Sequence, residues 1–186
     1  MMDKIQFLRE GIKNIKTVGT LTRSSRFLCS KIVSLANLRG SKCIVELGAG
    51  DGVMTKHILN NMPEDATLFA FEIHPKFCER LRRIKDPRLH VIHDSAENLK
   101  DHLTENGFSQ IDTVFSALPF VMLPSALAKK IVSSCHQNLK PLGQYFQIHY
   151  SLLEKNLYKN IFGKVEMTFH LLNIPPAFIL SCYKAA

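Results

Sequence analysis

The stretch Val45-Glu46-Leu47-Gly48-Ala49-Gly50-Asp51-Gly52 decides the fold that we expect for this chain. It ends a short apolar run and leads into a stretch with helical spacing, so we place it at a turn from a strand to a helix. Glycines in such a turn let the backbone approach a ligand closely, and the start of a helix offers unpaired N–H groups. Val53 stands where a dinucleotide fingerprint needs its third glycine, and Glu46 precedes the first one. The turn therefore fits a cationic ligand better than a pyrophosphate.

A second acidic residue closes the next apolar run. Glu72 follows Gly52 by 20 residues, at the end of the run Thr67–Glu72. At this spacing, a carboxylate at a strand end can accept hydrogen bonds from both hydroxyls of a ribose. The glycine turn, the leading acid and the spaced carboxylate together indicate a binding site rather than a turn that only shapes the chain.

From residue 43 onward, apolar runs alternate with stretches of helical spacing. We expect strands at Cys43–Leu47, Thr67–Glu72, Leu89–His93, Ile111–Ser116, Gln144–Tyr150, Lys164–Leu172 and Phe178–Tyr183. Helices are expected between the first five strands, near 52–62, 75–84, 96–105 and 124–139, and Pro141-Leu142-Gly143 should end the last of them. Continuously apolar strands are typical of a parallel sheet that is covered on both faces. The link at 173–176 is too short for a crossover helix, so the last two strands should pair antiparallel.

The composition favours one globular domain. The chain has 186 residues, of which 46% are hydrophobic, and this is enough to bury a core. No run approaches the 18 apolar residues of a membrane-spanning helix, and the start lacks the apolar core of a secretory signal. The five cysteines are far apart and form no Cys-x-x-Cys pair, which argues against a disulfide framework and for a reducing cytosol.

Nearly all of the excess positive charge lies in the first 42 residues. They hold nine Lys and Arg against Asp3 and Glu10, whereas the other 144 residues are almost balanced. We therefore divide the chain into a basic helical arm, 1–42, and a domain, 43–186. Such an arm suits phosphate groups, either on nucleic acid or on a lipid surface, although a basic helix without a partner is an alternative.

The arm should hold two helices. One apolar stripe in residues 4–18 is formed by Ile5, Leu8, Ile12 and Ile15. The basic residues that we expect to meet lipid phosphates are Lys4, Arg9, Lys13, Lys16 and Arg26. A second helix should start near Ser24-Ser25 and carry Phe27, Leu28, Ile32 and Leu35 inward. The first helix is interpreted as an interfacial helix on an anionic membrane, and the alternative is a lid packed over the ligand site.

The motifs resemble those of class I S-adenosylmethionine-dependent methyltransferases. Glu46-x-Gly48-x-Gly50-x-Gly52 looks like the first motif of that superfamily, Glu72 matches its ribose-binding acid, and Asp94-Ser95 matches its adenine-contacting segment. The resemblance implies that the cofactor is S-adenosylmethionine. It implies a Rossmann-like α/β fold with a seven-stranded, mostly parallel sheet, in which the seventh strand lies antiparallel between the fifth and the sixth. The cofactor-binding residues that we assign are Glu46, Gly48, Ala49, Gly50, Gly52, Glu72, Ile73, Asp94 and Ser95.

Three segments resemble the bacterial phospholipid N-methyltransferases more closely. Ser116-Ala117-Leu118-Pro119-Phe120 is similar to their Ser-Gly-Leu-Pro loop, with Ala117 in place of the glycine. Phe146-Gln147-Ile148-His149-Tyr150 resembles their fifth strand, and Asn173-Ile174-Pro175-Pro176-Ala177 their segment before the last strand. The entrance from Phe7 to Arg26 is also similar, with Arg23 in place of a proline. The resemblance implies a membrane phospholipid as substrate, namely phosphatidylethanolamine, which would be converted to its methylated forms and phosphatidylcholine.

The site that the resemblance implies needs no metal, because the methyl donor is an activated sulfonium. The enzyme must hold the electron pair of the amine in line with the S–CH3 bond and exclude water. We assign this task to Ser116, Leu118, Pro119, Phe120 and Tyr150. Ser116, the Leu118 carbonyl and Tyr150 would accept the proton or orient the nitrogen, and Phe120 would offer a ring face to the methylated head group. His149 and Tyr150 point to opposite faces of their strand, and the resemblance favours Tyr150.

Three other readings stay open at the level of sequence. The rRNA adenine-N6 dimethyltransferases share the fold, and their loop reads Asn-Leu-Pro-Tyr where this chain has Ser116, Leu118, Pro119 and Phe120. The substrate could also be another aminolipid, such as ornithine lipid, and a membrane-associated cofactor-binding protein without turnover is a more remote reading. Ser116 lacks the amide that suits an adenine amine, so we expect no nucleic acid as substrate. From the cysteine pattern and the basic arm, we expect a cytoplasmic enzyme that is bound peripherally to an anionic membrane.

Overall fold

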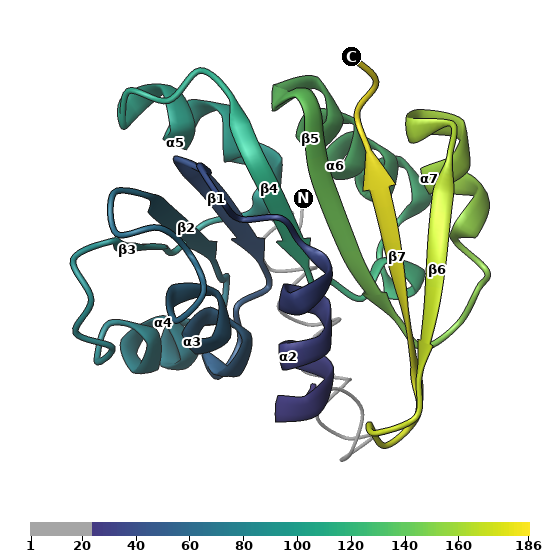
Figure 1. Cartoon of the computed structure of the whole chain (residues 1–186), viewed down its shortest axis with the longest axis horizontal. Coiled ribbons are helices and arrows are strands. Elements are labelled where there is room, and N and C mark those ends of the chain that lie inside the picture. The colour runs from purple at the N-terminus through teal and green to yellow at the C-terminus, as the bar shows by residue number, and fades with distance from the viewer. Residues whose placement is uncertain (1–23) are drawn as a thin grey trace, which may run out of the picture.

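The computed structural model describes residues 24–186; the expected helix at 4–18 lies outside the described residues. The strands form one sheet in the order β3-β2-β1-β4-β5-β7-β6 (Figure 1). Their bounds are β1 Cys43–Leu47, β2 Thr67–Phe71, β3 Leu89–Ile92, β4 Ile111–Ser116, β5 Leu139–His149, β6 Val165–His170 and β7 Ala177–Tyr183. All pairs are parallel except those of β7, which runs antiparallel to both β5 and β6. The expected Rossmann-like fold, with its single antiparallel strand between the fifth and the sixth, is confirmed.

Helices cover both faces of the sheet. The helices are α2 Arg26–Leu35, α3 Val53–Leu59, α4 Pro75–Leu81, α5 Leu99–Glu105, α6 Ser125–Asn138 and α7 Lys155–Phe162, with short 3-10 helices η1 Ala96–Asn98 and η2 Phe120–Met122. In Figure 1, α2, α3 and α4 lie in front of the sheet, and α5, α6 and α7 lie behind it. Within residues 24–186, no helix has the length and the apolar character that crossing a bilayer requires.

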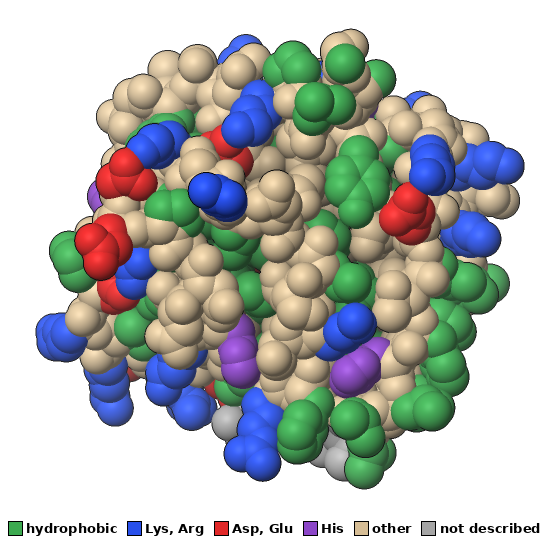
Figure 2. Space-filling view, viewed as in Figure 1, with side chains coloured by type: hydrophobic (Ala, Val, Ile, Leu, Met, Phe, Trp, Pro, Cys, Tyr) green, Lys and Arg blue, Asp and Glu red, His purple; other side chains and the backbone are tan. Residues whose placement is uncertain are grey.

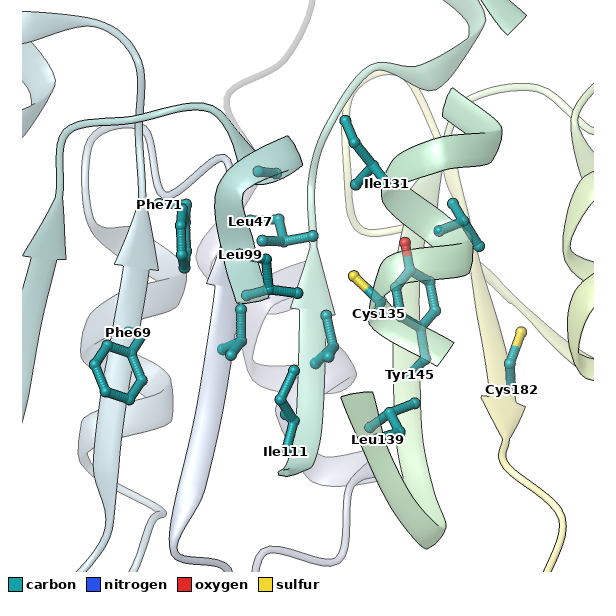
Figure 3. Packing of buried hydrophobic residues seen from close by; sticks show 14 of the residues in the cluster. Leu47, Phe69, Phe71, Leu99, Ile111, Ile131, Cys135, Leu139, Tyr145 and Cys182 are labelled. Atoms are coloured by element: carbon teal, nitrogen blue, oxygen red, sulfur yellow. The ribbon is translucent and has the colours of Figure 1, made fainter. Parts of the chain in front are cut away.

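The two faces bury separate apolar clusters. Val45, Leu47 and Tyr145 pack with α5, α6 and α7, while Ile44 packs with α2 and α3. Figure 3 shows the first cluster, in which Leu47, Leu99 and Tyr145 lie between the sheet and the helices of that face. Every residue of β1 and β4 is buried, because neighbouring residues of a strand point to opposite faces and both faces are covered. All five cysteines are unpaired and buried, and they pack as small hydrophobic residues.

The fifth strand begins earlier than the sequence predicts. Its first residue, Leu139, follows α6 directly and pairs with Ile111, so the segment Pro141-Leu142-Gly143 lies within the strand instead of before it. The pairing with β4 then jumps from Leu139 to Gln144, because the residues between them bulge out of the ladder. Leu142 adopts a φ of 61° there. A proline cannot donate to a ladder, and the bulge accommodates it inside a strand.

The buried face of α2 also differs from the face that the sequence predicts. Leu28, Cys29, Ile32 and Val33 are its buried residues, whereas Phe27, which we expected inward, is 49% exposed. The buried stripe recurs at three and four residues, and Phe27 lies outside this stripe. Residues 24–42 therefore contribute to the same core as the sheet. The helix α7 and the turn η2 were not predicted; both are short segments between strands.

The carboxyl ends of the parallel strands meet at one edge of the sheet. The strand β1 lies between β2 and β4, and the order of strands reverses there. Ligands of open α/β sheets bind outside the carboxyl ends of the strands at such a switch point. The turn after β1 is therefore the first place at which to look for a site.

Candidate active site

The turn after β1 is held against the end of β2 by two backbone hydrogen bonds. The N–H groups of Gly48 and Ala49 donate to the carbonyl of Phe71 at 2.9 and 3.1 Å. Gly48, Gly50 and Gly52 have φ values of 76°, 54° and 82°, a region that L side chains rarely adopt. The predicted run of glycines is thus required by the backbone itself.

Each of these glycines meets a different environment. A Cβ on Gly48 would lie 3.1 Å from the Leu118 side chain, and one on Gly52 would lie 3.1 Å from that of Leu81. A Cβ on Gly50 would point into open space, with its nearest neighbour at 4.0 Å. Gly48 therefore allows the loop after β4 to approach, Gly52 allows α4 to pack, and Gly50 keeps a space open beside the turn.

Glu72 joins the turn to the end of β2. Its Oε2 accepts the N–H of Gly50 at 2.8 Å, and its Oε1 accepts the N–H of His74 at 2.8 Å. The side chain is buried, so these two bonds fix the carboxylate in one orientation. A carboxylate has about four acceptor positions, and both oxygens keep a lone pair for a ligand. This is the arrangement that binding two hydroxyls of a ribose requires.

Glu46 is fully buried beneath the same turn. Thr55 donates its hydroxyl to Oε2 at 2.6 Å, while Oε1 is buried without a hydrogen-bond partner. Desolvation raises the pKa of Glu46 from 4.5 to about 8, and the nearby charges of Glu72 and Asp51 act in the same direction. A positive charge close to this carboxyl would relieve both effects.

Asp94 and Ser95 follow β3 and cap the turn η1. Burial alone would raise the pKa of Asp94. Hydrogen bonds from Asn98, His102 and the N–H of Ser95 outweigh burial and lower this pKa. Ser95 accepts the N–H of Glu97 at 3.3 Å. These residues and Glu72 follow neighbouring strands, β3 and β2, at the same edge of the sheet.

Ile73 is half-buried next to Glu72. A ring nitrogen of His93 lies 3.2 Å from its carbonyl oxygen. Ile73 thus lies just after β2, between Glu72 and the segment at Asp94 and Ser95.

The loop after β4 lies across the glycine turn. The N–H of Ala117 donates to the carbonyl of Leu47 at 2.9 Å, and the Leu118 side chain lies over Gly48. Ser116 is fully buried, and its hydroxyl lies 3.4 Å from the N–H of Leu118, which donates to it. The predicted cofactor turn and the predicted substrate loop are therefore in direct contact.

A family assignment agrees with this geometry. The sequence profile of the ribosomal RNA adenine dimethylase family matches residues 23–171. The chain belongs to this family. It is a class I S-adenosylmethionine-dependent methyltransferase, as the first motif indicates.

One named relative and two solved structures illustrate what the chain is similar to, the structures in fold alone. The chain is 29% identical over 185 residues to an ornithine lipid N-methyltransferase of Singulisphaera acidiphila, covering 98% of this chain and 96% of the relative. An rRNA methylase of Streptococcus thermophilus has a similar fold, with a TM-score of 0.65, 13% identity and coverage of 90% and 100% of the two chains. The magnesium protoporphyrin IX methyltransferase of Synechocystis, solved with S-adenosylmethionine bound, covers 100% of this chain and 86% of its own at 12% identity and a TM-score of 0.64.

The residues of this methyltransferase fit S-adenosylmethionine, its cofactor. The open space beside Gly50 offers room, and Glu72 offers acceptors for the ribose. The unpaired Oε1 of the buried Glu46 suits a ligand that carries positive charge. The structure thus brings the glycine turn, Glu72 and Glu46 together at the carboxyl ends of β1 and β2.

The other predicted substrate residues are arranged differently from our expectation. Phe120 is 1% exposed, and its ring packs edge to face against Tyr158, with centroids 6.3 Å apart. It therefore presents no free face to a cationic head group in this arrangement. The Leu118 carbonyl accepts the N–H of Phe120 at 2.9 Å and the amide of Gln147 at 3.0 Å, so both of its lone pairs are used. Pro119, which lies between Leu118 and Phe120 in the sequence, is half-buried.

His149 and Tyr150 point to opposite faces at the end of β5, as predicted. A ring nitrogen of His149 lies 2.9 Å from the hydroxyl of Tyr158, and burial lowers the pKa of His149 to about 4. Tyr150 is half-buried against the cluster that lies beneath α2 and α3. Ser116 lies on the face of His149, so Ser116 and Tyr150 lie on opposite sides of the sheet edge.

Gln147 is a residue of this site that the sequence reading did not assign. It is fully buried, and besides the Leu118 carbonyl it holds the hydroxyl of Tyr145, which donates to its Oε1 at 3.0 Å. A glutamine in the middle of an apolar strand was the available signal, because a buried amide must find partners.

Of the basic residues expected at lipid phosphates, Arg26 is the one in the described part of the chain. It is exposed at the start of α2, and its guanidinium lies 4.9 Å from the ring centroid of Phe27. Lys4, Arg9, Lys13 and Lys16 lie outside the described residues.

Proposed function

We propose that this methyltransferase acts on the amine of an aminolipid head group, with phosphatidylethanolamine and its methylated forms as the substrate that we favour. The observation that carries the proposal is the similarity along the whole chain to the ornithine lipid N-methyltransferase. That relative supports N-methylation of an aminolipid, and the loop at 116–120, which lies against the cofactor turn, is where we propose that the amine binds.

The chemistry asks little of the protein beyond positioning. S-adenosylmethionine supplies a methyl group that is already activated on a sulfonium. The protein must hold the amine in line with that methyl group and keep water away, which are the main catalytic effects available here. The contact between Leu118 and Gly48 fixes the distance between the substrate loop and the cofactor turn.

The lipid amine must lose a proton before it can attack. An apolar pocket favours the neutral amine, because desolvation disfavours the ammonium form. Ser116 and Tyr150 are the side chains that we propose to orient the nitrogen. Because the Leu118 carbonyl already accepts two hydrogen bonds, we assign it a structural task in holding the loop.

We also propose that the enzyme works at the surface of an anionic membrane. The basic N-terminal arm supports this proposal, since Lys and Arg near an anionic surface contribute about 1 kcal/mol each to binding. Replacing Lys4, Arg9, Lys13 and Lys16 with Glu should then reduce binding to phosphatidylglycerol vesicles at low salt.

RNA adenine is the second candidate substrate, because the family that matches is named for it. Ser116 argues against this candidate, since its hydroxyl lacks the paired donor and acceptor of the amide in the Asn-Leu-Pro-Tyr loop. The proposal therefore places RNA second.

One experiment separates these substrates. The purified protein is incubated with S-adenosylmethionine that carries a labelled methyl group, in parallel with total lipid and total RNA. Label in the lipid fraction is expected, and purified phosphatidylethanolamine and ornithine lipid then identify the head group. Label in RNA alone would refute the lipid proposal.

A further inference from the structure

Three loops on the carboxyl edge of the sheet carry exposed apolar side chains. They are residues 117–124 after β4, 150–153 after β5 and 171–176 after β6. The large hydrophobic side chains exposed by half or more in these loops are Met122, Leu153, Leu171, Leu172 and Ile174, and we call them the apolar rim. None of the three loops contains an Asp, Glu, Lys or Arg. Ordinary surface loops are polar, so uncharged loops with exposed leucines point to a surface that meets an apolar partner.

The register of the sheet brings the three loops to the edge that holds the site. Ser116 pairs with Gln147, and two residues further along β5 His149 pairs with Phe178. Phe178 in turn pairs with Phe169, at the end of β6. The rim therefore lies at the edge where the glycine turn and the loop at 116–120 also lie. Figure 2 shows hydrophobic side chains gathered at the lower right, where the tip of the β6–β7 hairpin lies in Figure 1.

The N-terminal arm joins the described structure next to this rim. The N–H of Ser25 donates to Oδ1 of Asn173 at 2.7 Å, and its hydroxyl donates to the Leu172 carbonyl at 2.6 Å. The first 23 residues contain five Lys and Arg and two acidic residues. Arg26, which is exposed, follows one residue after Ser25. The exposed Arg26 thus brings positive charge close to this uncharged apolar surface.

We propose that the apolar rim inserts into the interface of an anionic lipid bilayer and seats the mouth of the site on the membrane. The inference rests on the proposed function and deepens it, because it names the surface through which the lipid would enter. Exposed aliphatic side chains gain free energy when they leave water for the boundary between head groups and acyl chains, and the flanking cations meet lipid phosphates. A lipid head group could then reach the loop at 116–120 while its acyl chains stay in the bilayer.

Lipid explains this surface better than RNA does. Proteins hold RNA mainly through basic and aromatic side chains, whereas the rim consists of aliphatic leucines, an isoleucine and a methionine. A bilayer also matches the combination of an apolar centre with positive charge at one side.

The test uses the full-length protein and vesicles of phosphatidylglycerol mixed with phosphatidylcholine. The rim variant is L153S/L171S/I174S, which replaces three side chains that are 69–92% exposed. The matched control is L142S, because Leu142 is equally exposed but lies at the opposite edge, near the start of β5. Co-sedimentation is measured at low and high salt, together with melting temperature and affinity for S-adenosylmethionine.

We expect the rim variant to bind vesicles roughly a hundredfold more weakly than the wild type, and L142S to stay within about twofold. The difference should persist at high salt, because salt screens the charges and not the apolar contribution. Affinity for S-adenosylmethionine should be unchanged in both variants. Unchanged vesicle binding by the rim variant would overturn the inference. A lower melting temperature with unchanged vesicle binding would also overturn the inference, because it would indicate that residues 1–23 cover the rim. A variant that loses binding to RNA and keeps binding to vesicles would overturn the inference as well.

The two proposals can fail separately. Methylation of a short-chain phosphatidylethanolamine dissolved without vesicles tests the substrate independently of the membrane. If the wild type methylates this lipid and the rim variant still binds vesicles normally, the docking inference is wrong and the proposed function stands. If the rim variant loses vesicle binding but no aminolipid is methylated by the wild type, the docking inference stands and the substrate is wrong.

Discussion

The side-chain amide of Gln147 donates a hydrogen bond of 3.0 Å to the main-chain carbonyl of Leu118. The same amide reaches the Ile148 carbonyl at 2.8 Å, and its oxygen accepts the hydroxyl of Tyr145. One buried side chain of β5 thus ties the loop after β4 to the core. Since the Leu118 side chain lies over Gly48, the hydrogen bond also sets how the loop meets the cofactor turn.

Replacing Gln147 with Leu should disconnect this loop. The variant removes the Gln147 acceptor of the Tyr145 hydroxyl and the amide donor of the Leu118 carbonyl, so the free energy of unfolding should fall by about 1–3 kcal/mol. Turnover should fall by roughly tenfold or more, because a loop displaced by about an ångström misplaces the reacting groups. Urea unfolding and steady-state kinetics measure the two effects.

Gln144→Leu is the matched control for Gln147→Leu. Gln144 lies on the same strand and exchanges two hydrogen bonds with the backbone of Asn37, far from the loop. We expect some loss of stability and unchanged turnover. Equal losses of turnover in the two variants would show that Gln147 has no specific effect on the loop.

Phe120→Ala tests whether the buried ring serves structure, substrate or both. The ring is almost fully buried, so its removal should cost about 3–5 kcal/mol of stability. Phe69→Ala, at an equally buried position in β2, should cost a similar amount. Well below both melting temperatures, we expect turnover to fall with Phe120→Ala alone and affinity for S-adenosylmethionine to remain nearly unchanged. The opposite pattern, with lost cofactor affinity, would assign this loop to the cofactor.

The cofactor half of the site could be predicted because it depends on local sequence. The backbone of the turn needs positive φ, which selects Gly48, Gly50 and Gly52, and the strands on either side have a simple apolar pattern. The bounds of β1 and β4 are as predicted for the same reason. Glu72 could be assigned from its place at the end of the next strand.

The substrate half could not be predicted as fully, because it depends on contacts between distant segments. Nothing local to Phe120 indicates that its ring packs against Tyr158 of α7, a helix that the sequence pattern did not indicate. One of the two hydrogen bonds at the Leu118 carbonyl comes from Gln147, which is 29 residues away. The bulge at Pro141 is likewise visible only once β5 pairs with β4.

Gly50→Val should abolish measurable binding of S-adenosylmethionine. A Cβ there would enter the open space beside the turn, and a branched side chain would fill more of it. Gly107→Val is the matched control, because Gly107 also has a positive φ, 79°, with open space around it. Both variants carry the same kind of backbone strain, so stability should fall in both. Calorimetry that finds normal binding by Gly50→Val would contradict this position of the ligand.

Glu72→Ala should weaken binding of S-adenosylmethionine by at least about tenfold. The change removes two charge-assisted acceptors for the ribose and releases the N–H groups of Gly50 and His74. Glu72→Gln keeps one acceptor oxygen, so its affinity for S-adenosylmethionine should lie between those of the wild type and Glu72→Ala. Glu79→Ala, an exposed change on α4, should leave the affinity unaltered, and an unchanged affinity in Glu72→Ala would remove this residue from the site.

The buried carboxyl of Glu46 should make stability depend on pH. Its pKa is about 8 in the folded protein and 4.5 ordinarily, so between these values the folded state keeps a proton that the unfolded chain has released. Unfolding then releases a proton, and the free energy of unfolding should fall as pH rises from about 5 to 8, by up to about 1.4 kcal/mol per pH unit.

Glu46→Gln isolates this dependence, because the amide keeps an acceptor for the Thr55 hydroxyl but cannot titrate. At pH 5 the free energy of unfolding of the variant should be equal to that of the wild type or lower. From pH 5 to pH 8 the value for the wild type should fall relative to that of the variant. Urea unfolding of both proteins across this range measures the difference directly, with other titrating groups cancelling. Two parallel stability curves would mean that Glu46 is ionised in the folded protein, so that the unpaired Oε1 must be compensated by a group other than a proton. A stability difference between the two proteins that changes steadily between about pH 5 and pH 8 would show that the Glu46 carboxyl stays protonated in the folded protein over this range.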